Sequence, residues 1–529
     1  MLVDCIHPNQ SGYFSKLILD YLNENEAIKP LYNRFPNLEN FKDQITEKQK
    51  NYSDTDRAIL IDALKKQYQG KEISEETKQN IEKLQNNTTF TITTGHQLNL
   101  FSGPVYYLYK ILSVINLSEQ LKSKYQEYDF VPVFWMATED HDFEEINNFK
   151  FRDKKIVFST DEIGPVGRFK TKGLEKVYQT IDKEFGTSTR ANYLKNIFKK
   201  AYLENDTLAD ATFFLTNEIF KKFGILIVNG DCSILKSNFR EEIKNEIFNN
   251  TLYNNIESTL PLLKDYHTQV NPREINLFYI KDGLRERIIK ENETYKINNT
   301  KLSFSNNKIL DLINKKPEEF SPNAIFRPVY QETVLPNLAY VGGGGELAYW
   351  LELKSGFKAF NKTFPILIHR DSVLLVSKKL DKKIQKLNLT YSELFLNATD
   401  LNRKKTIEYS NLNLDFTDLK NQLINQFKTL EMLAQKTNKN FETALQAQRT
   451  KQINGLDKLQ KRLLNAEEKS LHDKLNRIIS IKDELFVNNS LQERNQNFSE
   501  FYIDSDNDLI HLLKTTLNPL QSGFKIIII

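Results

Sequence analysis

The chain has 529 residues, of which 40% are hydrophobic and 11% aromatic, so it can form a large globular domain with at least one appended part. Its 73 basic and 69 acidic residues leave a net charge of only +4, which argues against a surface that coats nucleic acid. Cys5 and Cys232 are the only cysteines, which excludes a disulfide framework and a zinc site built from thiolates.

The sequence predicts a cytoplasmic protein that binds neither a membrane nor nucleic acid. Its first residues lack the basic start and apolar run of a signal peptide. No stretch approaches the roughly 20 apolar residues that a membrane helix needs. The low cysteine count fits a reducing compartment.

Five short apolar runs predict a parallel sheet. Each run is apolar throughout rather than alternating, which is typical of strands buried on both faces, and helical patterns separate them. The predicted fold class is therefore α/β, with a doubly wound, Rossmann-like core in residues 1–380. The runs are residues 90–94, 130–137, 224–228, 338–341 and 364–369.

The remaining parts of residues 1–380 are predicted as a helical lead-in and two insertions. Residues 1–87 are polar and periodic, which indicates helices. The insertions are expected near 145–222 and 260–320. They would contain one edge strand, Phe149 to Ser159, and the short strands Asn276 to Ile280 and Arg285 to Ile289.

Residues 381–490 predict a helical coiled-coil arm. Apolar side chains repeat about every 3.5 residues across 414–485, between charged flanks, so two antiparallel helices are expected. The second would have about 45 residues and a length of about 65 Å. An isolated pair would leave apolar surface exposed, so we expect the arm to form a homodimer. Residues 491–529 should pack back on the core, because their final apolar hexamer would aggregate if exposed.

The turn after the first strand, Thr94 to Pro104, has features of a phosphate-binding loop. Its glycines let the backbone approach a ligand, and a helix predicted to start near Pro104 would offer free N–H groups. His96, expected on a solvated loop, could stabilise a transferring phosphoryl group. The alternative is a plain turn with a structural histidine. The turn matches neither the dinucleotide fingerprint nor the Walker pattern.

A cluster of carboxylates and one imidazole, Glu139 to Glu145, follows the second strand. Such a cluster could bind a metal ion, hold an amine or act as a general base. The alternative is a helix N-terminus with acidic residues in its first turn.

The third block joins Ser321–Glu332 to Tyr340–Glu346. Arg327 could bind a phosphate or carboxylate in bidentate fashion. Four consecutive glycines, Gly342 to Gly345, indicate a tight loop or close ligand approach, with a disordered linker as the alternative. His369-Arg370-Asp371 ends the fifth strand, where one of the three is expected to cap structure.

Taken together, these blocks resemble one known family. The segments TGHQLNLFSGPVYYLYK, VPVFWMATEDHDFEEIN, SPNAIFRPVYQETVLPNLAYVGGGGELAYW and LIHRDS are similar to signatures of the bacillithiol cysteine ligase (BshC) family. The resemblance covers nearly the whole chain. It implies a nucleotidyltransferase-like core, as in class I aminoacyl-tRNA synthetases, with connecting-peptide insertions and a dimerising coiled coil.

The implied activity is the last step of bacillithiol biosynthesis, a nucleotide-driven ligation of L-cysteine to the amine of glucosaminyl-malate. ATP would be a substrate, and Mg²⁺ is a possible cofactor to which no protein ligands are assigned. The rival hypothesis is a nucleotide-binding scaffold that acts through its coiled coil.

The residue roles follow the same blocks. The expected catalytic residues are His96, Asp140, His141 and Asp142; the expected nucleotide-binding residues are Gly95, Gln97, Ser102, Gly103 and Arg327; and the expected substrate-binding residues are Glu139, Asn323, Tyr330, Gln331, Gly343, Gly344 and Glu346. Whether the carboxyl group is activated by adenylyl or phosphoryl transfer stays open.

Overall fold

The computed structural model describes residues 1–436, 439–506 and 508–529. The chain divides into two compact units. The larger consists of Met1–Asn9, Tyr13–Leu375 and Gln492–Ile529, and the smaller of Gln10–Gly12 and Val376–Leu491. Within the described residues, every helix is too short or too polar to cross a membrane.

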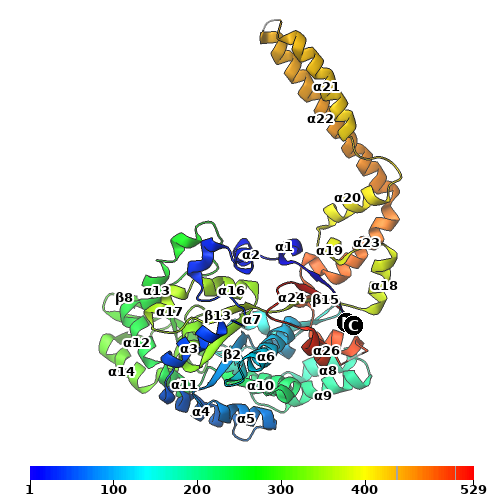
Figure 1. Ribbon diagram of the computed structural model, residues 1–529. Helices are drawn as coiled ribbons and strands as arrows, with labels where there is room; N and C mark the ends of the chain where they lie inside the picture. The colour runs from blue at the N-terminus through cyan, green and yellow to red at the C-terminus, as the bar shows by residue number, and fades with distance from the viewer. Residues whose placement is uncertain (437–438, 507) are drawn as a thin grey trace. The chain divides into compact units, whose positions relative to one another are not determined.

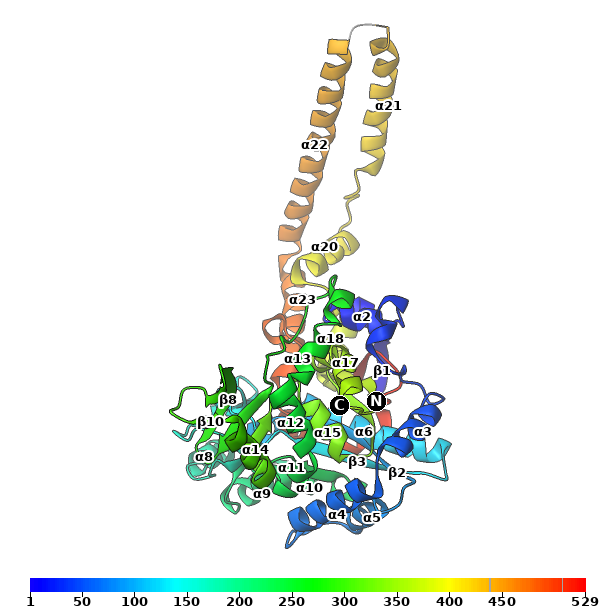
Figure 2. The ribbon, with the colours of Figure 1, turned by 90° about the vertical axis from the view of Figure 1, so that its left-hand side faces the viewer.

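A five-stranded parallel sheet forms the centre of the larger unit (Figures 1 and 2). Its spatial order is β13-β12-β2-β3-β6, and each of the five apolar runs predicted as a parallel strand contributes one of these strands, which confirms the α/β prediction. From β2 the chain adds β3 and β6 on one side of the sheet and later adds β12 and β13 on the other side. In such a doubly wound sheet, ligands bind where the strand order switches, which here is between β2 and β12. The strands are β2 (Thr89–His96), β3 (Asp129–Met136), β6 (Leu226–Asn229), β12 (Asn337–Gly342) and β13 (Ile366–His369).

The sequence of β2 explains how a strand with four threonines can be fully buried. Phe90 and Ile92 lie in an apolar cluster with residues of α6 (Tyr106–Lys124), which packs against β2 and β3. Thr91 and Thr93 donate instead to the side-chain oxygen of Asn337, at 3.3 and 2.8 Å. Thr94 donates to the carbonyl oxygen of Val341 at 2.7 Å, so three of the four buried hydroxyls have partners, as buried polar groups require, and that of Thr89 has none among the described residues.

The lead-in begins with a strand that the sequence analysis missed. β1 (Leu2–Ile6) pairs antiparallel with β15 (Phe524–Ile528), and β15 also pairs with β14 (Ser372–Val376). The C-terminal hexamer is thus the buried central strand of a small sheet. The helices of the lead-in are α1 (Pro8–Ser11), α2 (Lys16–Leu22), α3 (Phe41–Asn51), α4 (Asp54–Tyr68) and α5 (Glu75–Lys83).

In the first insertion, the single edge strand predicted over 149–159 was wrong. The segment forms a two-stranded hairpin, β4 (Asn148–Phe151) and β5 (Lys154–Val157), because Arg152 adopts a φ of 51° and reverses the chain. The helices of this insertion are α7 (Phe143–Ile146), α8 (Glu175–Glu184), α9 (Thr189–Leu203) and α10 (Leu208–Phe220).

The second insertion contains a five-stranded antiparallel sheet, ordered β10-β9-β8-β7-β11. It includes both predicted short strands, as β7 (Leu277–Lys281) and β8 (Leu284–Glu291). The other elements from Ser233 to Ala359 are α11 (Ser233–Asn238), α12 (Arg240–Asn249), α13 (Thr251–Ile256), β9 (Thr294–Ile297), β10 (Ser303–Ser305), α14 (Asn306–Lys315), β11 (Phe320–Pro322), α15 (Arg327–Val334), α16 (Gly344–Leu351) and α17 (Lys354–Ala359).

In the smaller unit, α21 (Thr417–Ala434) and α22 (Lys439–Ser470) lie side by side (Figure 2). The continuous second helix of about 45 residues was wrong, because Leu471 leaves helical geometry with φ −93° and ψ 8°. Beyond that break, α23 (His472–Leu485) packs on α18 (Lys378–Lys386) and α20 (Ala398–Tyr409). The other helices after β14 are α19 (Tyr391–Leu394), α24 (Gln492–Asn495), α25 (Phe498–Asp504) and α26 (Leu509–Thr516).

Candidate functional site

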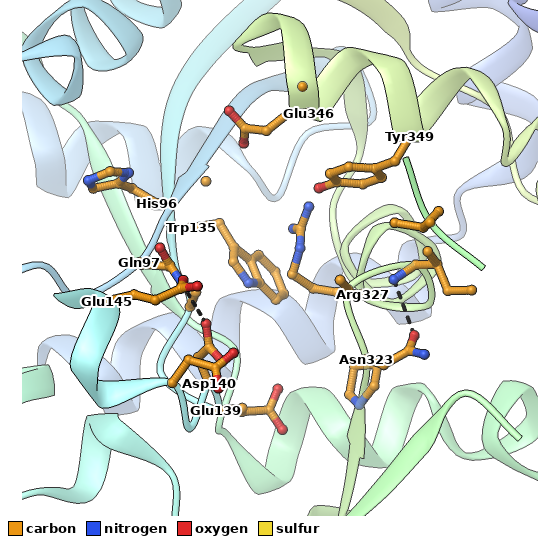
Figure 3. A pocket seen from close by; sticks show the side chains of 18 of the residues that line it. His96, Gln97, Trp135, Glu139, Asp140, Glu145, Asn323, Arg327, Glu346 and Tyr349 are labelled. Carbon is orange, nitrogen blue, oxygen red and sulfur yellow. Dashed lines mark hydrogen bonds between the residues drawn. The ribbon is translucent and has the colours of Figure 1, made fainter. Parts of the chain in front are cut away.

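A cavity of about 1020 Å³ opens at the carboxyl ends of β2, β3 and β12, where the strand order predicts a ligand site (Figure 3). Side chains from β7, β8 and residues 269–275 close it from the second insertion. Of the predicted site residues, Gly95, His96, Gln97, Glu139, Asp140, His141, Asp142, Asn323, Arg327, Gly343 and Glu346 line the cavity. Ser102, Gly103, Tyr330, Gln331 and Gly344 lie outside that lining.

An ion pair between a buried lysine and a partly exposed glutamate lies where β2 and β12 are neighbours. Lys110, on α6, donates to the carbonyl oxygen of Gly95 at 2.5 Å and lies 2.7 Å from a carboxylate oxygen of Glu346. Glu346 also accepts from the Tyr340 hydroxyl at 2.7 Å and from the backbone N–H of Gly343 at 2.9 Å. Burial acts to raise the pKa of Glu346, but these partners outweigh it and lower the pKa to about 2. The carboxylate is therefore ionised and already engaged.

His96 is buried, contrary to the solvated loop expected from the sequence. Its ring contacts Tyr106 edge-on and Tyr107 at a tilt, and Nε2 lies 3.4 Å from the carbonyl oxygen of Ser102. Burial, together with the positive charge of Lys110, lowers the pKa of His96 to about 3. The imidazole is therefore neutral near pH 7 and can act only as a hydrogen-bonding group, not as a cation.

The loop after His96 is held by the C-terminal segment. Asn497 donates to the carbonyl oxygens of Phe101 and Gly103, at 2.8 and 2.5 Å. Gly103 has a φ of 63°, and a Cβ there would lie 2.6 Å from Cβ of Asn99. Ser102 also has a positive φ, and its buried hydroxyl has no partner among the described residues. This part of the predicted phosphate loop shapes the cavity wall without facing the cavity.

Arg327 reaches the cavity from the first turn of α15, and a chain of polar residues on the same helix fixes its guanidinium. It donates to Gln331 at 2.9 Å, and Gln331 donates to Glu332 at 3.0 Å. Glu332 pairs with Lys48 at 3.3 Å, and both of these side chains are almost fully buried. Gln331 therefore positions the guanidinium from behind rather than contacting a ligand.

Two further arginines line the same end of the cavity. Arg370, after β13, pairs with Glu493 at 2.6 Å, and its guanidinium lies over the ring of Tyr106 at 4.9 Å. Arg494 is exposed and has no side-chain hydrogen bond or ion pair within the described residues. With Lys110 and Arg327, these side chains give this end a positive character.

Carboxylates gather at the end of β3, on the other side of the cavity (Figure 3). Gln97 donates to Asp140 at 2.9 Å and to Glu145 at 3.2 Å, so it joins the end of β2 to this cluster. Glu139 forms a buried ion pair with Lys236 and is thereby engaged. Asp140, Asp142 and Glu145 remain accessible from the cavity.

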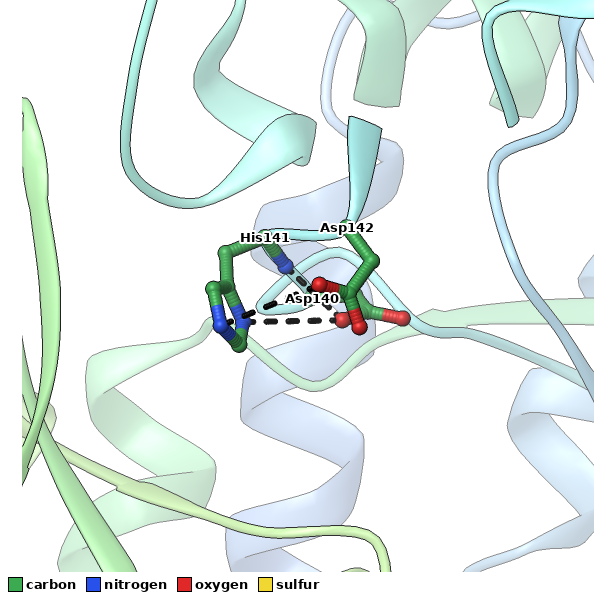
Figure 4. Close-up of side chains that lie close together, drawn as sticks. All are labelled: Asp140, His141 and Asp142. Atoms are coloured by element: carbon green, nitrogen blue, oxygen red, sulfur yellow. Dashed lines mark hydrogen bonds and ion pairs between the residues drawn. The ribbon is translucent and has the colours of Figure 1, made fainter. Parts of the chain in front are cut away.

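His141 lies beside Asp140 and Asp142 (Figure 4), and it also contacts Arg285 of β8. Nη1 of Arg285 lies 2.6 Å from Nδ1 of His141, and since a guanidinium only donates, Nδ1 accepts. The proton of the neutral ring is then on Nε2. Ligand atoms of Asp140, His141 and Asp142 lie within 4.8 Å of one another, close enough for a metal ion.

Asn323 and Tyr330 have partners that fix the protein itself. Asn323 accepts from the backbone N–H of Phe326 at 3.0 Å and donates to Asn276 at 2.9 Å, which holds the turn before α15. The hydroxyl of Tyr330 donates to the carbonyl oxygen of Gly230 at 2.8 Å. Gly343 caps α16 through Glu346, whereas Gly344 faces residues of the lead-in.

The sequence analysis did not assign as binding groups six basic residues that line the cavity: Lys110, Arg273, Arg285, Arg287, Arg370 and Arg494. Lys110 had a usable signal, because it is the one charged residue in the mostly apolar and aromatic stretch Tyr106–Val114. Arg285 had none, since its contact with His141 joins segments 144 positions apart. Arg494 follows the smaller unit in the chain, and no local pattern relates it to β2.

Comparisons with known proteins identify the family. The model described as "Bacillithiol biosynthesis BshC, N-terminal Rossmann-like domain" matches residues 1–371, and "Bacillithiol biosynthesis BshC, C-terminal coiled-coil domain" matches 373–529. A solved structure titled "Crystal structure of putative arginyl t-RNA synthetase from Campylobacter jejuni" covers 83% of this chain and 95% of its own, at 10% identity and a TM-score of 0.22.

Relatives named "Putative cysteine ligase BshC" align along the whole chain. That of Flavobacterium johnsoniae is 53% identical and covers 100% of both chains, and that of Flavobacterium psychrophilum is 53% identical over 100% of this chain and 99% of its own. That of Cytophaga hutchinsonii is 37% identical over 98% and 97%. The two domain models and these full-length relatives confirm the resemblance seen in the motifs and show that the chain belongs to the BshC family of bacillithiol biosynthesis.

Proposed function

We propose that this protein is an ATP-dependent ligase that joins the carboxyl group of L-cysteine to the amine of glucosaminyl-malate. The observation that carries the proposal is one cavity with a cationic end at the β2–β12 point and a carboxylate end at β3. Family membership supports the same reaction. A carboxylate is a poor electrophile at neutral pH, so it must first be activated by transfer of a phosphoryl or adenylyl group.

The nucleotide phosphates would bind at the cationic end. Arg327, Arg370 and Arg494 would offer donors to phosphate oxygens and balance the charge that develops during transfer. His96, held neutral by burial, would contribute a hydrogen bond at the same end. Lys110 is engaged by Glu346 and would keep the end of β2 in place.

The amine of the acceptor would bind at the carboxylate end. An ammonium ion cannot attack, so a base must remove one of its protons before the amide forms. His141 is a poor candidate, because Nδ1 already accepts from Arg285 and Nε2 carries the proton. We therefore assign the base to Asp140, which Gln97 holds at 2.9 Å.

A Mg²⁺ ion would enter with the nucleotide. Asp140 is the proposed base, and His141 offers a nitrogen rather than the oxygen that Mg²⁺ prefers, so no protein ligand is assigned to the ion. Phosphate binding and proton removal, as described above, are assigned to side chains of the protein and not to the ion. We further propose that the protein acts in the cytoplasm, where nucleotide and free cysteine are available.

The test measures bacillithiol formation by mass spectrometry from cysteine, glucosaminyl-malate and ATP. His96→Gln and Asp140→Asn should each lower the rate about 10²–10³-fold, the usual cost of losing one electrostatic or proton-transfer group. His96→Gln is preferred to His96→Ala, because alanine would leave a cavity at this buried position. Asp161→Asn, on an exposed loop, is the matched control.

Product formation by the parent with no loss in either variant would remove both residues from the mechanism. No product with any nucleotide would favour a nucleotide-binding scaffold instead.

A further inference from the structure

Two arginines of the second insertion line the cavity without a charged partner. Arg287, on β8, is half-buried, and Arg273, before β7, is exposed. Across the residues that the structure describes, neither guanidinium takes part in a hydrogen bond or an ion pair. Unpaired guanidinium groups around a cavity favour an anionic ligand.

The guanidinium of the neighbouring Arg285, unlike that of Arg287, has several partners. Arg285 and Arg287 are two residues apart on one strand, so both side chains leave the same face of β8. The guanidinium of Arg285 is engaged by His141, by the carbonyl oxygen of Pro322 at 3.2 Å, and by the ring of Phe278 at 4.1 Å. Arg287 pairs in register with Phe278, and its guanidinium has no such partners among the described residues.

The backbone of Arg273 is held in place, although its side chain is free. Its N–H donates to Asn276 at 3.1 Å, and its carbonyl oxygen accepts from Asn276 at 2.7 Å. Asn276 is fully buried and is bound in turn by Glu246 at 2.7 Å. A few residues earlier, the N–H of Gln269 donates to the buried Glu352 at 2.8 Å. The loop that carries Arg273 is therefore fixed by hydrogen bonds to buried side chains.

We propose that Arg273 and Arg287 form a subsite for the dicarboxylate group of the acceptor, the malate moiety of glucosaminyl-malate. The inference rests on the proposed function and extends it. Each guanidinium would bind one carboxylate in bidentate fashion. The acceptor carries an amine at one end and two carboxylates at the other. The cavity lining offers both kinds of partner, with Asp140 and Asp142 close to Arg285 and with the two free arginines of the second insertion.

The experiment compares two acceptors on the full chain by calorimetry and turnover. One is glucosaminyl-malate, and the other is methyl glucosaminide, which has the same amine but no carboxylate. The variants are Arg273→Gln, Arg287→Gln and the double substitution, with Lys301→Gln as the matched control. Lys301 is an exposed cation of the same insertion that lies outside the cavity lining.

In the double variant, the Kd and KM for glucosaminyl-malate should rise at least about tenfold, since charge-assisted hydrogen bonds are lost. The values for methyl glucosaminide, and kcat, should stay within about twofold of the parent. Lys301→Gln should change neither acceptor.

Equal weakening of both acceptors, or an unchanged preference for glucosaminyl-malate, would overturn the subsite. Failure of the parent to bind glucosaminyl-malate would also overturn it. Normal binding with no thiol product would instead count against the ligase reaction and leave the subsite supported.

Discussion

Replacing Glu346 by Gln removes the charge at the centre of the β2–β12 crossing. The variant keeps the size of the side chain but leaves Lys110 buried without a counter-charge. The amide of the new side chain can still accept from Tyr340 or from the N–H of Gly343, so the lost contribution is mainly the ion pair. Leaving a buried lysine without a counter-charge lowers the free energy of unfolding strongly.

The magnitude follows from the depressed pKa. The pKa of Glu346 falls from an ordinary value of 4.5 to about 2, and one unit corresponds to about 1.36 kcal/mol. The full shift would give about 3 kcal/mol. Because 28% of the side chain is exposed, we expect about 2–3 kcal/mol of unfolding free energy.

The sign predicts a specific dependence on pH. When the pKa of a carboxyl group is lower in the folded than in the unfolded state, the group stabilises the protein fully at a pH above its unfolded-state pKa. This contribution is lost as the pH falls through the folded-state pKa. The difference between parent and Glu346→Gln should thus be constant from about pH 7 to about pH 5.5 and shrink by about two fifths by pH 3.5.

Urea unfolding followed by tryptophan fluorescence measures this difference at each pH. Glu82→Gln, an exposed carboxylate on α5, serves as the control and should change the unfolding free energy by no more than about 0.5 kcal/mol. A difference below about 1 kcal/mol at pH 7, or one that grows as the pH falls, would refute the reasoning.

Three further predictions concern folding and assembly. Lys48→Met should cost about 3–5 kcal/mol in urea unfolding, because it leaves the buried Glu332 unpaired, and adding Glu332→Gln should recover part of that loss; equal costs for the single and double variants would contradict the ion pair. Gly103→Ala should lower the Tm, with a cost above about 1 kcal/mol, because its φ is positive and the new Cβ meets Asn99 at 2.6 Å. Deleting residues 390–485 should convert a dimer into a monomer in light scattering, since apolar side chains on α21 and α22 are exposed; a dimeric deletion would place the interface elsewhere.

The central sheet was predictable because its strands are buried on both faces. Runs such as Phe130–Ala137 and Phe364–His369 are apolar throughout, and no other common element has that pattern at this length. β1 was not predictable from local pattern, since four of its five residues are exposed and its partner β15 is at the other end of the chain. The break at Leu471 was also missed, because the heptad pattern continues through it and only packing on α18 and α20 reveals it.

The site was predictable where a strand end carries polar or flexible residues. His96 is the last residue of β2 and Asp140 follows β3 closely, so the rule that ligands bind at the carboxyl ends of strands placed both at the cavity. The same rule cannot tell which side chains face inward. Tyr330 and Gln331 both lie about one turn into α15, and each is turned toward protein partners.

The two ends of the cavity also explain why one fold can run both halves of the proposed reaction. Activation of a carboxylate gathers negative charge, which the arginines at the β2–β12 end would balance. Attack by an amine needs a base, and the proposed base, Asp140, lies at the β3 end, where Gln97 donates to its carboxylate at 2.9 Å. Gln97 directly follows His96 at the end of β2, so this hydrogen bond would fix the proposed base relative to the cationic end of the same cavity.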